Sequence, residues 1–261
     1  MRIQKNVPLK KYTTFKIGGP AKYFCLARNK KDLIEAIKWA KEKKMPFFIL
    51  GGGSNLLVSD RGFDGLVIKF QNPKLGDFVE QGLEWAAGIP GTLAGAVRGN
   101  AGAFGRSMED VVKEVEVFDV KTRKIKIFKN KQCQFSYRNS IFKKNPNLII
   151  LSVKIKTGRA DPKKIKQYLN YRETHHPQLP SAGSVFKNPK GVRAAKLIAD
   201  CGLAGKQVGR AQISIQHPNF IVNLGGAKAS DVLKLINLTK RKVKNKFKIK
   251  LQEEIQYLGK F

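Results

Sequence analysis

The sequence predicts a mixed α/β fold, and two kinds of pattern predict it. A helical period over residues 31–44 gives way at once to a short apolar run over 47–50. Farther along, the segments 115–120, 124–128 and 148–156 have the apolar and partly alternating character of β-strands. Neither an internal repeat nor a low-complexity linker interrupts this pattern.

The first helix is predicted from one apolar face, and its end from a proline. The residues of that face are Leu33, Ile34, Ile37 and Ala40. Pro46 ends the helix, and the run FFIL that follows predicts a buried strand. A glycine-rich loop comes next, so the segment has the order of helix, strand and loop that is common at phosphate-binding turns.

Two more helices are predicted in the second half of the chain. Asp161-Pro162 is a favourable helix start, and Ser230 is a favourable N-cap residue. The apolar residues are Ile165, Tyr168 and Leu169 on one face of the first helix, and Val232, Leu233, Ile236 and Val243 on the inner face of the second. The basic run 240–250 predicts the exposed side of the second helix, leading into a strand.

Composition predicts a soluble globular protein of two or three lobes. The chain has 261 residues, 42% of them hydrophobic, and no apolar run of membrane-spanning length. No secretory signal is visible at the N-terminus, so we expect a cytoplasmic protein without membrane insertion. The three cysteines lie far apart, which predicts free, buried or half-buried thiols, no disulfide framework and no metal site.

The charge balance is strongly basic, with 51 Lys and Arg against 19 Asp and Glu and a formal net charge of +32. Basic proteins often bind nucleic acid, and this stays open as a remote alternative. The excess is spread along the chain and lacks an aromatic and basic recognition motif, which favours a solvated surface and no nucleic-acid partner. A positive field that concentrates anionic nucleotides and their sugar conjugates is a third interpretation.

The turn LGGGSN places three glycines before two polar residues. Gly51, Gly52 and Gly53 can adopt positive φ and turn backbone N–H groups toward one anion, and Ser54 and Asn55 add side-chain donors. The pattern is neither a P-loop nor a Rossmann fingerprint, because no Gly-Lys-Ser/Thr follows and no helix opens with G-x-G-x-x-G. A phosphate-binding turn and a merely tight turn both remain open.

A second glycine-rich stretch covers residues 88–105 and reads GIPGTLAGAVRGNAGAFG. It holds six glycines and four alanines, with Thr92 and Asn100 as its main polar residues. So small a lining suits a wall for a large flat or extended ligand such as a dinucleotide, and close packing of backbone in a core is the alternative.

Eight motifs in a fixed order make the chain similar to a known family. They are TTFKIGGPA (13–21), LGGGSNLLVSD (50–60), GIPGT (88–92), NAGAFG (100–105), FSYRNSIF (135–142), PSAGSVFKNP (180–189), HPNFIVN (217–223) and LQEEI (251–255). Together they resemble the UDP-N-acetylenolpyruvoylglucosamine reductase family, flavoenzymes that make UDP-N-acetylmuramate for peptidoglycan. The resemblance runs nearly end to end.

The resemblance implies an α+β fold, with a two-subdomain FAD-binding region of the vanillyl-alcohol-oxidase/PCMH type and a smaller α/β substrate-binding domain. The parts would be 1–69 (with 250–261 returning to the active site), 70–160 and 161–249. Noncovalent FAD is implied, with its pyrophosphate at Gly51 to Asn55. The other cofactor-binding residues by resemblance are Thr92, Gly95, Asn100, Ala101 and Gly102.

The implied reaction is reduction of UDP-N-acetylglucosamine enolpyruvate by NADPH through bound FAD. This enol ether needs a hydride at one alkene carbon and a proton at the next, and charge gathers on its carboxylate. By resemblance, Arg138 and Glu254 face that charge, and Ser184 donates the proton. An ionised carboxylate repels such charge, so Glu254 acts either protonated or with its charge offset by Arg138.

For the sugar nucleotide, the resemblance points to Asn188 and His217, with Lys187 nearby. Family members commonly carry a phosphate-binding Lys where this chain has Ala204, and Lys206 is the substitute that the sequence offers.

The chain is short of the family pattern between Lys69 and Leu83. The family carries a strand-and-helix unit there, whereas this chain has only FQNPKLGDFVEQG, which Pro73 and Gly76 break. We expect the join to be a loop that leaves apolar edges uncovered. That expectation favours an inactive deletion variant, or an omission from the recorded chain, over a trimmed enzyme.

A different FAD-dependent oxidoreductase of the same fold is the second interpretation. The joint presence of Ser184, Arg138 and Glu254 argues against it, because an oxidase of this fold needs no such proton donor.

Overall fold

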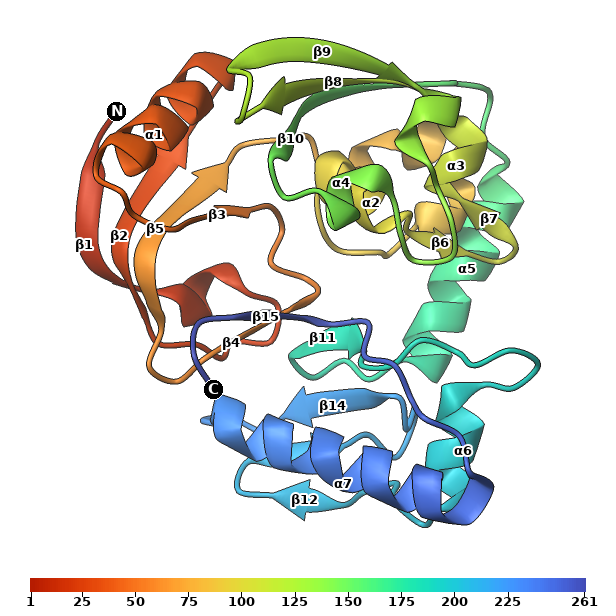
Figure 1. Ribbon diagram of the computed structural model, residues 1–261. Coiled ribbons are helices and arrows are strands. Elements are labelled where there is room, and N and C mark those ends of the chain that lie inside the picture. The colour runs from red at the N-terminus through yellow and green to blue at the C-terminus, as the bar shows by residue number, and fades with distance from the viewer. The chain divides into compact units, whose positions relative to one another are not determined.

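The computed structural model describes residues 1–261, which form two compact units (Figure 1). The first unit comprises 1–2, 25–52 and 68–172, and the second comprises 3–24, 53–67 and 173–261. The chain passes from one to the other five times: before β1 (Ile3–Pro8), inside β2 (Pro20–Ala27), between Gly52 and Gly53, inside β5 (Phe63–Phe70) and inside α5 (Pro162–His175). The three-part division implied by the family resemblance stays a prediction.

The first unit is built around a three-stranded antiparallel sheet of order β10-β8-β9. Its strands are β8 (Val112–Asp119), β9 (Lys124–Lys129) and β10 (Leu148–Ile155), and α2 (Leu93–Gly99) and α4 (Ile141–Lys144) pack beneath it (Figure 1). The remaining elements are α1 (Lys30–Glu42), β3 (Phe47–Leu50), β6 (Gly102–Ala103), β7 (Arg106–Ser107), α3 (Met108–Val111) and the 3-10 helices η2 (Leu75–Gln81), η3 (Glu84–Ala86) and η4 (Asn130–Cys133).

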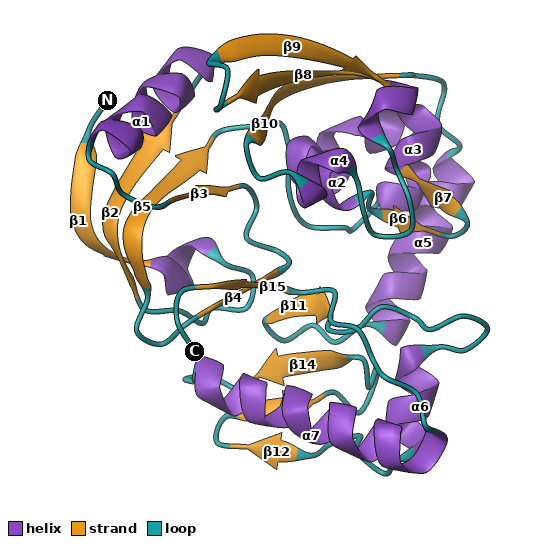
Figure 2. Cartoon of the chain, in the orientation of Figure 1, coloured by secondary structure: helices purple, strands orange, loops and turns teal.

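The second unit contains a four-stranded antiparallel sheet of order β11-β14-β13-β12, and α7 lies across it (Figure 2). These elements are β11 (Ser181–Ser184), β12 (Gln207–Val208), β13 (Ala211–Ile213), β14 (Phe220–Asn223) and α7 (Ala229–Phe247). The others are β1 (Ile3–Pro8), the 3-10 helix η1 (Leu9–Tyr12), β4 (Leu56–Val58), α6 (Ala194–Asp200) and β15 (Gln256–Leu258), which pairs in parallel with β4.

Each unit has its own hydrophobic core. In the first, Val115 and Val117 of β8 pack with Leu83, Trp85 and Phe142, all of them almost completely buried. The second core joins α6 and α7 to the four-stranded sheet; its buried members include Ile198, Ile213, Val232, Leu235 and Ile236. Hydrophobic residues recur at helical spacing along α7, so this otherwise charged helix has one apolar face, and that face is buried.

The predicted α+β class is confirmed, and so are the main predicted elements. The helix over 31–44 is α1, whose N-cap residue Asn29 accepts a 2.9 Å hydrogen bond from the backbone N–H of Asp32. The strands over 47–50, 115–120, 124–128 and 148–156 correspond to β3, β8, β9 and β10. The thiols of Cys25 and Cys133 are buried and that of Cys201 is half-buried, and all three are free, as expected.

Three predictions for the last helix are wrong, and the first concerns its N-cap. Its N-cap residue is Lys228 rather than Ser230, because the capping carboxylate comes from Asp60, far away in the sequence. The two oxygens of Asp60 accept hydrogen bonds from Ala229 N at 2.7 Å and Ser230 N at 3.0 Å.

The inner face and the end of α7 also differ from the prediction. Leu235 is fully buried, whereas Leu233 is only half-buried. No strand directly follows the basic run: residues 248–252 have no regular structure after the left-handed C-cap residue Lys248, with φ +60°, and β15 begins only at Gln256.

The expectation that the join after Lys69 is a loop with uncovered apolar edges is also wrong. The segment folds into η2 and η3, and Leu75, Leu83 and Trp85 are no more than 2% exposed. Backbone hydrogen bonds from Leu75 N to Gly91 O and from Leu93 N to Pro73 O fasten it to the start of α2. No large hydrophobic side chain between 70 and 90 is exposed, which favours a trimmed but properly packed unit.

Candidate functional site

The two glycine-rich stretches meet within the first unit. A Cβ atom built on Gly51 would lie 2.8 Å from Thr92 Oγ1, and one on Gly52 would lie 2.4 Å from Gly91 Cα. Both distances are too short for a real side chain. Positions 51 and 52 therefore need glycine because the second glycine-rich stretch approaches them closely. The two stretches that the sequence predicts as walls of the cofactor site are in contact here.

Gly53, in the second unit, is required for a separate reason. It adopts φ +65°, and a Cβ atom there would lie 2.1 Å from Tyr12 O. Its carbonyl accepts a 3.2 Å hydrogen bond from Thr14 N, which ties the turn to the segment after η1.

The turn itself keeps free donors. Gly52, Gly53 and Ser54 are half-buried, and none of their backbone N–H groups donates to a protein acceptor. Consecutive N–H groups without partners are the usual cradle for an oxygen-rich anion such as a phosphate. These residues therefore fit the pyrophosphate of a dinucleotide such as FAD.

The N-terminus of α2 does not offer such donors. The N–H groups of Leu93 and Ala94 donate to Pro73 O and Asn72 Oδ1, and that of Gly95 donates to Thr92 Oγ1 at 3.2 Å. Thr92 and Gly95 therefore shape the wall by capping the helix, and their contact with a cofactor stays a prediction.

Asn100 connects this wall to the segment that carries Arg138. The left-handed residue Asn100, with φ +44°, is 4% exposed and donates from Nδ2 to Ser136 O at 3.0 Å. Its Oδ1 accepts from Glu109 N at 3.0 Å. Ser136 pairs with Asn139 in a tight turn that holds Arg138 half-buried at φ +56°. Asn100 thus positions the turn of the predicted catalytic arginine.

Ala101 and Gly102 continue the wall after Asn100. Ala101 accepts a backbone hydrogen bond from Met108 N at 2.9 Å. A Cβ atom on Gly102 would lie 2.5 Å from Arg106 O, so the β6–β7 hairpin requires this glycine. Neither residue uses a side-chain polar group, and any contact with a cofactor would come from backbone.

The second unit brings Ser184, Glu254 and Asn55 together, although 129 residues separate Ser184 from Asn55 along the chain. Glu254 N donates to Val185 O at 2.8 Å, directly beside Ser184. Asn55 Nδ2 donates to Glu254 O at 3.2 Å, and Gln256 N donates to Asn55 O at 3.0 Å. Ser184 and Glu254 are both half-buried, and their catalytic roles stay a prediction.

The four predicted substrate residues lie at different places in the second unit. Lys187 follows Ser184 and its N–H donates to Gln252 O at 2.9 Å. Asn188 Oδ1 accepts from Ala194 N at 3.0 Å and so holds the start of α6. Lys206 is exposed in the turn before β12, and nothing in this unit joins it to Ser184.

His217 stands before β14, which pairs with the strand of Ser184. Its ring meets that of Phe220 at 4.7 Å, nearly edge-on, and its Nδ1 atom is buried without a hydrogen-bond partner. Burial lowers the pKa of His217 below its ordinary value, the charge of His175 acts in the same direction, and a hydrogen bond with its own backbone opposes them. His217 is therefore a neutral ring near pH 7.

Sequence reasoning missed Lys69. This half-buried residue of β5 donates a hydrogen bond from Nζ to Gly51 O, at the edge of the glycine turn. The available signal was a single lysine in the apolar run LVIKF of a strand.

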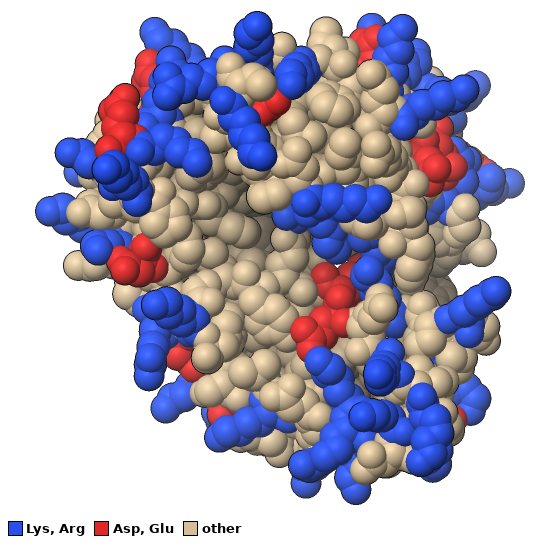
Figure 3. Space-filling model, viewed as in Figure 1, with Lys and Arg blue, Asp and Glu red and all other residues tan.

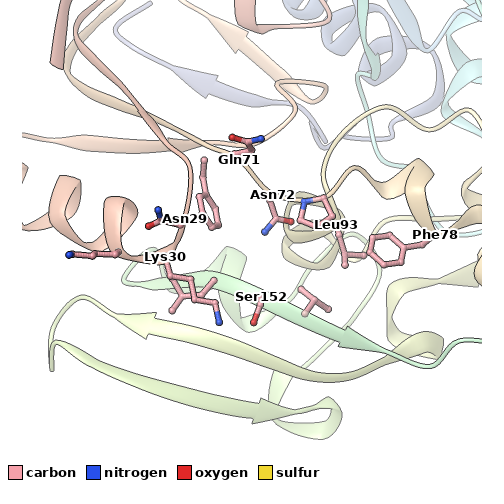
Figure 4. A pocket seen from close by; sticks show the side chains of 12 residues that line it. Asn29, Lys30, Gln71, Asn72, Phe78, Leu93 and Ser152 are labelled. Carbon is pink, nitrogen blue, oxygen red and sulfur yellow. The ribbon is translucent and has the colours of Figure 1, made fainter. Parts of the chain in front are cut away.

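A separate cavity of about 610 Å³ lies beside the join within the first unit (Figure 4). Figure 4 shows Asn29 and Lys30 at the start of α1, Gln71 and Asn72 of the join, and Ser152 of β10 around it. β10 is an edge strand of its sheet. The cavity therefore lies between the shortened segment and an edge strand of the sheet.

In the view of Figure 3, Lys and Arg side chains lie in many separate places, mainly toward the edges, whereas much of the centre carries neither Lys and Arg nor Asp and Glu. No helix in the structure is long and apolar enough to cross a membrane. Nor does any group of three or more His, Cys, Asp or Glu side chains offer a metal site.

Comparisons with known proteins agree with this geometry. The model of the UDP-N-acetylenolpyruvoylglucosamine reductase C-terminal domain matches residues 175–258, and that of the FAD binding domain matches 21–80. UDP-N-acetylenolpyruvoylglucosamine reductase of Caldanaerobacter subterraneus subsp. tengcongensis is 40% identical over 287 residues, covering 99% of this chain and 94% of its own. The enzyme of Caldicellulosiruptor saccharolyticus is 42% identical, covering 98% and 92%.

A solved structure is also similar over both full lengths. The crystal structure of UDP-N-acetylenolpyruvylglucosamine reductase from Thermus caldophilus matches with a TM-score of 0.85 and 33% identity, covering 99% of this chain and 100% of that one. The Caldanaerobacter alignment runs over 287 positions although this chain has 261 residues, so about thirty positions are gaps in this chain. That number of positions is about the length of the strand-and-helix unit that we expect, from the sequence, to be missing.

Proposed function

The chain belongs to the UDP-N-acetylenolpyruvoylglucosamine reductase family, and from this premise we propose that it reduces UDP-N-acetylglucosamine enolpyruvate to UDP-N-acetylmuramate with NADPH. The reaction serves peptidoglycan precursor synthesis in the cytoplasm, with FAD as a noncovalent cofactor. The observation that carries the proposal is the hydrogen bond from Glu254 N to Val185 O, because it holds the backbone of Glu254 next to the residue that follows Ser184.

FAD, reduced by NADPH, supplies the hydride for the reaction. The chain's own residues would hold it through the free N–H groups of Gly52, Gly53 and Ser54. Here the close contact between the two glycine stretches supports the proposal, since a rigid backbone turn holds donors in place before a ligand arrives.

Ser184 Oγ–H donates the proton to the second alkene carbon. A serine hydroxyl is a weak acid, so it acts only on a strongly basic carbon held at hydrogen-bond distance. The backbone fixes the position of Ser184, because it pairs with Phe220 of β14, and its neighbour Val185 donates to Asn219 O at 2.8 Å.

Arg138 and Glu254 bind the substrate carboxylate, where negative charge increases during hydride transfer. The guanidinium offsets that charge. Glu254 acts as a hydrogen-bond donor in its protonated form or shares the charge of Arg138. Asn188, His217, Lys187 and Lys206 hold the sugar nucleotide.

The decisive assay is NADPH oxidation, followed at 340 nm, with purified protein, FAD and the enolpyruvyl sugar nucleotide. We expect oxidation that depends on both FAD and the sugar and is lost in Ser184→Ala. Oxidation that needs no sugar nucleotide, and passes electrons to oxygen instead, would assign the protein to another flavin-dependent oxidoreductase of this fold.

The remote alternative is tested with the same preparation. Tight duplex binding that weakens steeply with salt, by a protein that remains colourless with FAD, would identify a nucleic-acid-binding protein instead.

A further inference from the structure

Lys69 is the only cationic side chain that hydrogen-bonds to the glycine turn in the first unit. Its ammonium group donates to Gly51 O, and no carboxylate forms an ion pair with it. An ammonium group has three donors, so two remain for another partner. The adjacent N–H groups of Gly52, Gly53 and Ser54 are equally without protein acceptors.

Such a lysine is costly for the protein on its own. Lys69 is half-buried among the fully buried residues Val67, Ile68 and Phe70, and burial alone lowers the pKa of its ammonium group. Structural lysines of this kind normally have a carboxylate partner, which offsets the lost hydration. A cation that lacks one is stabilised when an anion binds beside it.

The Gly51 carbonyl group, which accepts the hydrogen bond from Lys69, also affects how well an anion binds at this turn. A bare carbonyl at the edge of an anion-binding turn places partial negative charge next to the ligand. The ammonium group on Gly51 O offsets this charge and adds a full positive charge at the peptide group that also carries the free N–H of Gly52.

From these observations we propose that Lys69 is a cofactor-binding residue that supplies the positive charge for the pyrophosphate of FAD at the Gly51 to Asn55 turn. The inference rests on the proposed function, because it requires a dinucleotide at this turn. If Lys69 were only a structural residue, its role would be to hold the Gly51 carbonyl. The two roles predict different effects of replacing Lys69 on the stability of the flavin-free protein.

The test compares Lys69→Met and Lys69→Arg with wild type. Lys154→Met is the matched control, since Lys154 is also a strand lysine of the first unit but its side chain is 69% exposed. FAD is titrated into flavin-free protein by fluorescence, and ADP and adenosine are used as competitors. Melting temperatures are measured without flavin.

Lys69→Met should weaken FAD binding by about tenfold or more, the size of one charge-assisted hydrogen bond. It should also reduce the preference for ADP over adenosine, because adenosine carries no phosphate. Lys69→Arg should retain part of the FAD affinity and part of the preference for ADP over adenosine. Lys154→Met should behave as wild type. The flavin-free Lys69→Met protein should melt no lower than wild type, since it has lost a desolvated charge.

Two results would overturn the inference. One is FAD affinity and ADP preference unchanged in Lys69→Met. The other is weaker binding together with a lower melting temperature of the flavin-free variant, which would make Lys69 a structural clamp. If wild type itself binds no FAD, the proposed function fails instead, and the two failures are thereby told apart.

Discussion

At the scale of single residues, the structure shows which atoms surround each glycine of the two glycine-rich stretches. Gly52 lies against Gly91, and Gly99 has open space around its Cβ position. The pair gives a matched test of whether backbone contact, rather than ligand contact, requires glycine in the turn.

Gly52→Ala should destabilise the flavin-free protein by about 1–3 kcal/mol, because the new methyl group overlaps Gly91 backbone that has no room to shift. Gly99→Ala should leave stability unchanged or raise it by about 0.5–1 kcal/mol, since alanine restricts the unfolded chain. Thermal melts without FAD measure both. An unchanged melting temperature in Gly52→Ala would mean that the turns are farther apart than in this structure.

Ser184→Ala separates the two halves of the proposed reaction. Flavin reduction by NADPH should stay nearly intact, and oxidation of the reduced flavin by the sugar nucleotide should slow by roughly 10²-fold or more, the usual effect of removing a positioned general acid. Stopped-flow absorbance of the flavin follows each half separately. Equal slowing of both halves would remove Ser184 from the role of proton donor.

His217 predicts a pH dependence of stability. Because its folded-state pKa is below the unfolded value, the unfolded chain binds the proton more readily. Stability from this residue is therefore present above about pH 6.5, the ordinary histidine value, and is lost as the pH falls through the lower folded-state pKa.

Melting temperatures at pH 7.5 and pH 5.5 test this prediction. His217→Phe should remove most of the loss on acidification, whereas His175→Gln should reduce it only slightly, because the charge of the exposed His175 is the smallest cause of the lowered pKa. Equal acid sensitivity in wild type and His217→Phe would show that other groups cause it.

At the scale of elements, the N-terminus of α7 depends on Asp60, which lies just after β4. This carboxylate accepts hydrogen bonds from two N–H groups of the first turn, and its negative charge also suits the positive end of the helix dipole. The Asp of the motif LGGGSNLLVSD thus has a structural role that couples the glycine-turn segment to the helix covering the second sheet.

Asp60→Ala should destabilise the second unit by about 0.5–2 kcal/mol, as expected for loss of a helix cap. The control is Asp64→Ala in β5, whose exposed ion pair with Lys22 contributes little. Hydrogen exchange at Ala229 and Ser230 should increase only in the Asp60 variant. Increased exchange in neither variant would argue against the cap.

The elements predicted from local pattern were those with a clear period or a clear boundary residue. α1 has a buried stripe and a capping Asn29, and β10 has a long apolar run. The join was predicted incorrectly because its turns of 3-10 helix owe their order to contacts with Gly91 and Leu93, which no local pattern records.

At the scale of the whole molecule, FAD should bind noncovalently and stabilise the fold. Neither glycine stretch contains His or Cys for covalent attachment. Free FAD at a hundredfold excess over Kd should stabilise the protein by about 2.7 kcal/mol, and acid precipitation should release all of it.

The same preparation tests the trimmed join. A well-folded protein of 29.2 kDa that binds FAD would establish a trimmed enzyme. A mass several kilodaltons higher would instead indicate residues missing from this sequence, and a protein of the expected mass that FAD does not stabilise would indicate a destructive deletion.

The sequence by itself determined the family and the fold class, and it predicted Ser184, Arg138 and Glu254 as catalytic residues, because ordered motifs and hydrophobic periods are properties of short segments. Only the tertiary structure decided which atoms those segments meet: Gly91 against Gly52, Asp60 at the start of α7, and the Lys69 ammonium at the glycine turn. These contacts join residues that are distant along the chain. Their geometry depends on how packed elements approach one another, and that approach is set by the whole core rather than by neighbouring residues in the sequence.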